Sequence, residues 1–142
     1  MSARSKIVNA LVDKLKGING TGTYKSNLYE NVEPRLRFWD EVNDMPFVCV
    51  TAGDETREYL PSGFKWGYLN VTIRIFVDSE DPVEELETIF EDIETVLDSN
   101  NSLVYDTNKS TTMISIISIT SDEGVMAPQG IGEMLITVQY DI

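Results

Sequence analysis

Histidine is absent from this 142-residue sequence, and cysteine occurs once, as Cys49. The chain therefore lacks the commonest general base and the commonest zinc ligand, and Cys49 has no partner for an internal disulfide. No Gly-x-Ser-x-Gly elbow or Asp-x-Asp-x-Asn-Gly calcium loop offers another route to catalysis or metal binding. Adjacent acidic pairs such as Glu84-Glu85 lie in polar stretches, and nothing in the pattern places two carboxylates across an apolar cleft. We predict that the protein is not an enzyme and holds no metal or cofactor.

Long apolar runs are also missing. No stretch approaches the roughly 18 apolar residues of a membrane-spanning helix, and the N-terminal Met1–Lys6 is charged rather than apolar like a signal-peptide core. The hydrophobic fraction of 42% is nevertheless enough for one core in a chain of this length. We expect a soluble protein with no membrane partner, folded as a single domain over residues 1–142.

Basic residues are scarce and unevenly placed. The sequence has 11 Lys and Arg against 24 Asp and Glu, a formal net charge of −13. Residues 1–37 hold seven basic and three acidic residues, whereas residues 38–142 hold four basic and 21 acidic ones. An acidic body repels nucleic-acid phosphates, which argues against sequence-specific DNA binding. The basic N-terminal part is either a handle for an acidic neighbour, including another copy of the chain, or a solvated helix face.

Two segments carry the apolar spacing of amphipathic helices. The first follows Ser2 or Ser5 as a candidate N-cap, and the second, residues 82–98, has Asp81 as N-cap and Pro82 in its first turn. The predicted buried stripes are Ile7, Leu11, Leu15 and Ile18 in the first helix and Val83, Leu86, Phe90, Ile93 and Leu97 in the second. The predicted solvated face of the second helix consists of Glu84, Glu85, Glu87, Glu91, Asp92, Glu94 and Asp98.

Alternation with a period of two predicts the strands. Residues 68–77 alternate over a long run rich in β-branched and aromatic side chains, which is typical of a central strand. A turn is expected at Gly53-Asp54, and the last two strands are expected to pair as a hairpin. The other predicted strands cover residues 46–52, 55–59, 103–105, 112–120 and 133–142, and residues 24–32 are expected to form a short strand or an extended segment. These elements predict an α+β fold in which two main helices pack against a mixed or mostly antiparallel β-sheet.

The order of these elements resembles the tail-terminator, or tail-completion, proteins of long-tailed bacteriophages. The local features that carry the resemblance are Ile7–Leu15, Gly20–Tyr24, Met45–Val50 before a glycine, the Asp-Pro helix start, and a final strand entered through Gly130-Ile-Gly132. The resemblance implies a structural virion protein that is assembled in the host cytoplasm and caps the completed tail tube, at its head-proximal end, as a hexameric ring. The implied partners are other copies of the chain, the tail tube protein and the head–tail connector protein, with DNA passing through the channel without sequence-specific binding.

Two alternatives stay open at this point. One is a head–tail connector or head-completion protein, which shares much of the same pattern. The other belongs to a different class, a small acidic regulatory protein that binds a cellular partner through DNA-like charge. A ring-sized mass and co-purification with tail tubes would favour a tail role over the regulatory one.

Two sets of side chains are candidate contact residues. Interfaces favour aromatic residues and Met, so the expected loops suggest contacts through Tyr59, Phe64, Trp66, Met126 and Ile131, unless these side chains fold back onto the sheet. The second set is the acidic helix face, with Glu84, Glu87, Glu91 and Glu94. We expect this face to line a channel, to meet a neighbour's basic residues such as Arg4, Lys6 or Lys14, or simply to be solvated.

Overall fold

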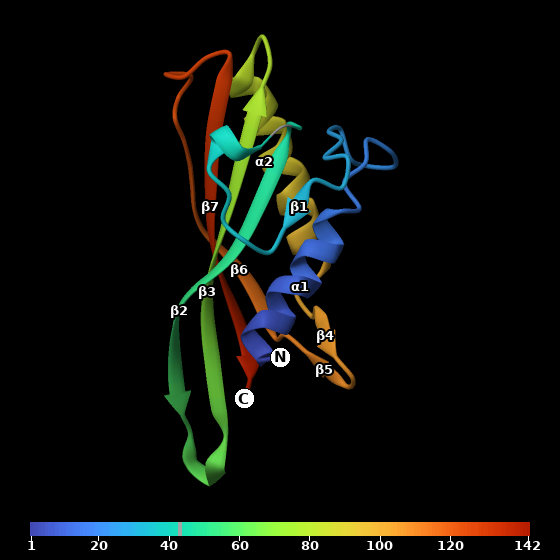
Figure 1. Ribbon diagram of the computed structural model, residues 1–142. Helices are drawn as coiled ribbons and strands as arrows, with labels where there is room; N and C mark the ends of the chain where they lie inside the picture. Colours follow the sequence, from blue (N-terminus) through green and yellow to red (C-terminus); the bar gives the residue numbers. More distant parts are fainter. Residues whose placement is uncertain (43) are drawn as a thin grey trace.

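A computed structural model describes residues 1–42 and 44–142, with Trp39 described by its backbone alone (Figure 1). Its elements follow in chain order: α1 (Ala3–Leu15), β1 (Val32–Glu33), η1 (Trp39–Glu41), β2 (Phe47–Tyr59), η2 (Pro61–Gly63), β3 (Lys65–Asp78), α2 (Pro82–Ser99), β4 (Val104–Asp106), β5 (Lys109–Ser110), β6 (Met113–Ser121) and β7 (Gln129–Asp141). Among the described residues, no helix combines the length and apolar character needed to cross a membrane.

Five strands form the main sheet, in the order β1-β2-β3-β7-β6. β1 is parallel to β2, and the other neighbours are antiparallel. β3 lies in the centre, where Ile73 pairs with Val50 on one side and Met134 on the other. The predicted central strand, the terminal hairpin and the α+β class are all confirmed.

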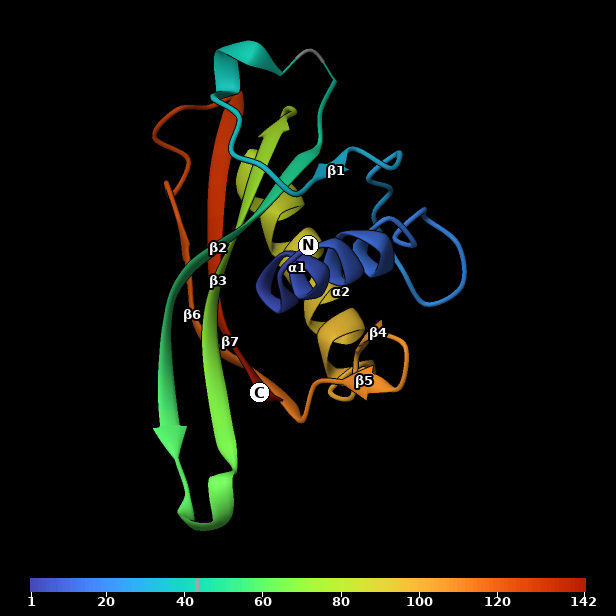
Figure 2. The ribbon, with the colours of Figure 1, turned by 60° about the horizontal axis from the view of Figure 1, so that its bottom comes forward.

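Both helices cover the same face of the sheet (Figure 2). α1 packs on β2, while α2 packs on β3, β7 and β6. The inward side chains of β3 are completely buried between sheet and helices: Leu69, Val71, Ile73, Ile75 and Val77. Each buried aliphatic side chain contributes about 1.5–3 kcal/mol, so this layer is the main source of stability.

The two helices begin where their caps predict. The Ser2 Oγ accepts a hydrogen bond from the Ser5 amide at 3.1 Å, and the Asp81 carboxylate accepts one from the Glu84 amide at 3.2 Å. Each bond satisfies an amide that has no partner within its own helix. The predicted stripe of α1 is buried throughout.

The acidic face of α2 contains one exception to the prediction. Asp92, which was assigned to the solvated face, is only 3% exposed. Its carboxylate accepts hydrogen bonds from the Ser26 amide at 2.8 Å, the Lys25 amide at 3.2 Å and the Ser26 hydroxyl. Asp92 therefore anchors the loop that contains Lys25 and Ser26. Val83 departs in the opposite direction, because it is 41% exposed although it was assigned to the buried stripe.

The predicted turn at Gly53-Asp54 is wrong. β2 continues through these residues, and its pairing with β3 shifts register between Ala52 and Glu55. A β-bulge accommodates the one extra residue in β2 without ending the pairing of the two strands. Within residues 24–32, predicted as a short strand or an extended segment, the strand is confined to the start of β1 (Val32–Glu33), and an isolated bridge joins Asn19 and Asn27.

Candidate functional site

The described residues contain no group of three or more His, Cys, Asp and Glu side chains placed to hold a metal ion. Cys49 is buried, and that burial raises the pKa of its thiol. A buried thiol with a raised pKa is protonated and inert at neutral pH. The two sets of predicted contact residues remain as the candidate site.

The first surface is an arm formed by the far half of the β2–β3 hairpin, residues 55–67, which extends beyond the helices (Figure 1). At its tip, Tyr59 is 67% and Phe64 62% exposed. The Lys65 ammonium lies 5.4 Å from the centre of the Tyr59 ring, a cation–π contact. Trp66 is half-buried at the start of β3, where it pairs with Glu58 and Asp141. The tip thus presents large aromatic surface to its surroundings.

A polar cluster holds the root of the arm. The Glu55 side chain is only 6% exposed, and its carboxylate accepts hydrogen bonds from the Tyr140 hydroxyl and from the Arg57 guanidinium at 2.9 Å. Tyr105 meets the Tyr140 ring edge-on at a centroid distance of 6.1 Å. Burial and the Glu55 carboxylate together raise the pKa of Tyr140 to about 12. This cluster ties β2 to β7 just beyond the β-bulge.

The other two candidate contact residues lie at the opposite end of the sheet. Ile131 is half-buried in β7 and pairs with Phe76, while Met126 is half-buried in the loop before β7. Trp66 and Phe76 are ten residues apart on β3, which at strand spacing separates them by roughly 33 Å. The structure therefore separates the five predicted contact residues into two distinct regions.

The four predicted acidic residues do come together. Glu84, Glu87, Glu91 and Glu94 line one groove of about 310 Å³ between α2 and the edge strand β6. Thr88, Phe90 and Ile119 complete its lining. The groove therefore combines a mostly acidic lining with two apolar side chains. Helical periodicity predicted that the acids share a face, but the contribution of β6 had no signal in the sequence.

Ion pairing leaves most of this acidic lining unneutralised. The Lys25 ammonium lies 3.2 Å from the Glu91 carboxylate, with both side chains more than half exposed. An exposed pair of this kind contributes only about 0.2–1 kcal/mol. Among the described residues, Glu84, Glu87 and Glu94 have no basic partner.

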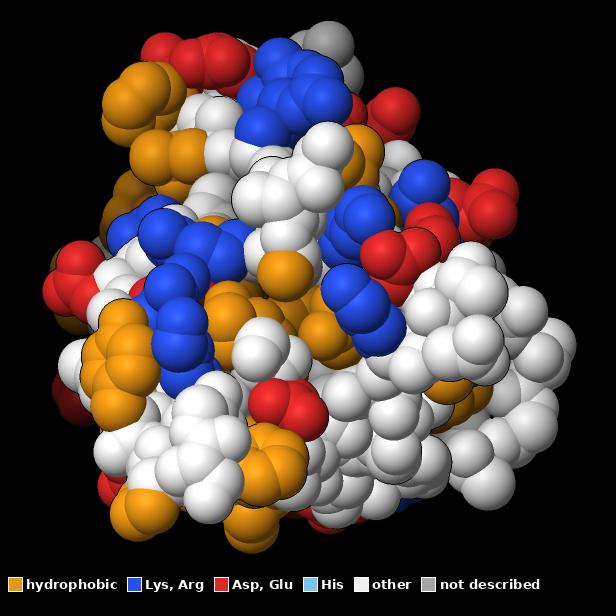
Figure 3. Space-filling model, turned by 90° about the horizontal axis from the view of Figure 1, so that it is seen from below, with side chains coloured by type: hydrophobic (Ala, Val, Ile, Leu, Met, Phe, Trp, Pro, Cys, Tyr) orange, Lys and Arg blue, Asp and Glu red, His pale blue; other side chains and the backbone are white. Residues whose placement is uncertain are grey.

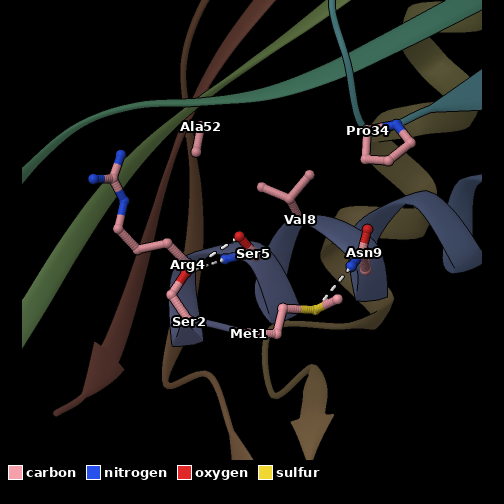
Figure 4. Close-up of a pocket in the computed structure, with 8 residues that line it drawn as sticks. All are labelled: Met1, Ser2, Arg4, Ser5, Val8, Asn9, Pro34 and Ala52. Carbon is pink, nitrogen blue, oxygen red and sulfur yellow. Dashed lines mark hydrogen bonds between the residues drawn. The ribbon is translucent and has the colours of Figure 1, made fainter.

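Several basic side chains lie at the end of the molecule that carries the arm. Figure 3 shows Lys and Arg side chains spread across the end of the molecule that carries the arm. Arg4 donates a hydrogen bond to the Gly53 carbonyl at the β-bulge, beside a hollow of about 490 Å³ lined by Met1, Val8, Pro34 and Ala52 among others (Figure 4).

Of the cations proposed to meet a neighbour, Lys6 has a partner within the chain. Its ammonium lies 2.6 Å from the Asp106 carboxylate and holds the pKa of Asp106 below its usual 3.8. Lys14 is exposed and, among the described residues, makes no ion pair.

Comparison with known proteins gives three results. A family described as "Bacteriophage Tail Tube Terminator Protein" matches residues 1–142. The tail tube terminator protein p142 of Escherichia phage T5 is 37% identical over 153 residues, covering 99% of this chain and 94% of that relative. A chain from a structure titled "Virion of native gene transfer agent (GTA) particle" has a TM-score of 0.64 with complete coverage of both chains. At 10% identity, that last likeness establishes a shared fold alone.

Proposed function

The chain belongs to the bacteriophage tail tube terminator family, a structural and non-enzymatic component of the virion tail, and from this premise we propose that it caps the completed tail tube as a closed ring. The ring, a hexamer, sits at the head-proximal end, provides the joining surface for the head connector and lets the genome pass through its channel. Family membership favours the tail role over the connector and the acidic regulator considered at first.

The projecting arm is the observation that carries this proposal. Beyond the last pair of β3 with β7, at Trp66 and Asp141, the arm ends in a turn with exposed Tyr59 and Phe64. Interfaces concentrate aromatic side chains of this kind. Contact with a neighbouring subunit or with the tube would cover the tip. The region around Met126 and Ile131 lies at the opposite end of the sheet, and we assign it to the other junction of the ring.

The acidic surface fits passage of DNA. A net charge of −13 repels phosphate, so the genome slides past the ring without being retained. The groove formed by Glu84, Glu87, Glu91 and Glu94 serves either as part of the channel wall or as a contact for basic residues of the next subunit.

Electron microscopy of tails tests the capping function. Tails from a phage that lacks this protein should carry no ring at their head-proximal end and should not join heads. Supplying the wild-type protein in trans should restore both the ring and infectious particles. Restored infectivity with tails that still carry no ring of this protein would refute the proposal.

A further inference from the structure

The two edges of the sheet differ in charge. α1 covers β2 and carries Arg4, Lys6 and Lys14 against Asp13. α2 covers β7 and the edge strand β6, and its exposed acids lie along that edge. Because β1 and β6 are the two ends of the strand order, the basic helix and the acidic helix lie toward opposite edges of one subunit, and Glu33, Asp40 and Glu41 add acidic side chains beside β1.

The acidic edge also exposes apolar side chains. β6 has β7 as its only strand neighbour among the described residues, so its outer edge is open. Ile117, at a β-bulge in β6, is 57% exposed, and Ile119 is 44% exposed beside the groove. An open edge strand with apolar side chains is a surface that proteins normally cover.

The opposite edge carries a segment with matching chemistry. Residues 34–38 follow the edge strand β1, and within them Leu36 is 49% and Phe38 65% exposed. Arg35 is exposed and makes no ion pair among the described residues. The segment therefore combines two apolar side chains with Arg35, which is unpaired among the described residues, and with Arg37, which pairs with Glu33 at 2.8 Å.

We propose that residues 34–38 of one copy dock into the α2–β6 groove of the next copy. Leu36 and Phe38 cover Ile117 and Ile119, and Arg35 lies over the acidic lining. The apolar contact supplies the affinity, while the charges fix orientation and exclude wrong pairings. A second copy is the occupant because the same chain presents both complementary halves on opposite edges.

This contact is head-to-tail, since it joins two different surfaces. Repeated around an axis it closes into a ring when the rotation fits. The inference rests on the proposed ring and names the surfaces that form it, with the acidic helix turned toward a neighbour instead of the channel.

Charge reversal on tails tests the contact. Arg35→Glu and Glu87→Lys each place like charges together, so each should lower the fraction of ring-capped tails by about tenfold or more. The double variant restores an opposite-charge pair at every contact and should recover capping. Lys109→Glu and Asp98→Lys are matched controls, because each makes the same charge change at an exposed position outside the proposed contact.

Thiol cross-linking gives a second readout that does not depend on destabilising the ring. A variant with Arg35→Cys and Glu87→Cys, treated on purified tails with a short bis-thiol reagent, should yield a ladder of covalent oligomers. Arg35→Cys alone should not, because the native Cys49 is buried.

Two outcomes separate failure of this inference from failure of the proposed function. Rings that are present but insensitive to both charge reversals, or capped tails without a cross-linked ladder, would overturn the contact and leave the capping function standing. Wild-type tails without a ring would refute the function itself.

Discussion

The Tyr140 hydroxyl on β7 donates its hydrogen bond to the buried Glu55 carboxylate on β2, two strands away across β3. Glu55 lies just past the β-bulge, so this bond fixes the direction in which the arm leaves the body.

Removing the hydroxyl by Tyr140→Phe should destabilise the subunit by about 1–3 kcal/mol, because a buried carboxylate loses a donor. Denaturant unfolding of the isolated protein measures the change. Tyr29→Phe is the matched control and should have no effect, since Tyr29 is 67% exposed. Equal stability of Tyr140→Phe and the wild type would show that the bond does not hold the arm.

The raised pKa of Tyr140 predicts that the stability of the subunit depends on pH. This pKa is raised from 10.0 to about 12, mainly by burial and then by Glu55, so folding favours the neutral phenol. That stabilisation is fully present below pH 10 and is lost as the pH rises through 12. The free energy of unfolding should therefore fall more steeply over this range in the wild type than in Tyr140→Phe. If the free energy of unfolding falls with pH equally in both proteins, Tyr140 is not the group responsible.

Gly67 is predicted to be intolerant of a side chain. A Cβ atom there would lie 2.7 Å from the Tyr140 ring. We expect Gly67→Ala to cost about 1–3 kcal/mol through overpacking, measured by thermal or denaturant unfolding. Gly53→Ala is a suitable comparison, because its Cβ would lie at an ordinary 3.4 Å from the Asn70 carbonyl oxygen. If both variants have the same free energy of unfolding, the close approach of Gly67 to the Tyr140 ring does not affect stability.

Asp92→Ala should destabilise the protein by about 1–3 kcal/mol, since the amides of Lys25 and Ser26 lose their acceptor. Hydrogen exchange should show the amides of residues 24–28 becoming less protected while those of β3 change little. Glu94→Ala, on the exposed face of the same helix, controls for loss of a carboxylate. Unchanged protection of the amides of residues 24–28 would show that Asp92 does not anchor this loop.

The arm tip should matter for assembly and not for folding. Phe64→Ser and Tyr59→Ser are expected to leave the unfolding transition unchanged, because both side chains are mostly exposed, while reducing the number of capped tails. Val104→Ser, at a position 68% exposed in β4 and outside the proposed contacts, is the control. Trp66→Ser should affect stability as well, since Trp66 is half-buried. A normal count of capped tails with both tip variants would argue against a contact role.

Local patterns predicted the elements well, and three-dimensional neighbours explain what they missed. The caps at Ser2 and Asp81 and the alternation of β3 are properties of short segments, so they can be read from the sequence. The role of Asp92 depends on a loop more than sixty residues earlier, which no helical pattern reveals. The glycine at Gly53 correctly predicts an irregularity in the strand. Whether a glycine ends a strand or forms a β-bulge depends on the partner strand, however.

The candidate surfaces also combine features that local sequence patterns predict with features that depend on long-range contacts. Helix periodicity placed the four glutamates of α2 on one face, and the structure brings them together. The position of β6 beside them follows from the strand order, a long-range property of the chain. The distance between Trp66 and Ile131 likewise became visible only from the pairing of β3 with β7.

The long central strand has a mechanical consequence. β3 pairs with β2 over residues 65–76 on one side and with β7 over residues 66–78 on the other. A pull on the arm along its axis loads both ladders in shear, so many hydrogen bonds share the force instead of opening one after another. If the arm contacts the tail as proposed, tension on the tail passes through the arm into the body of the subunit without unzipping the sheet.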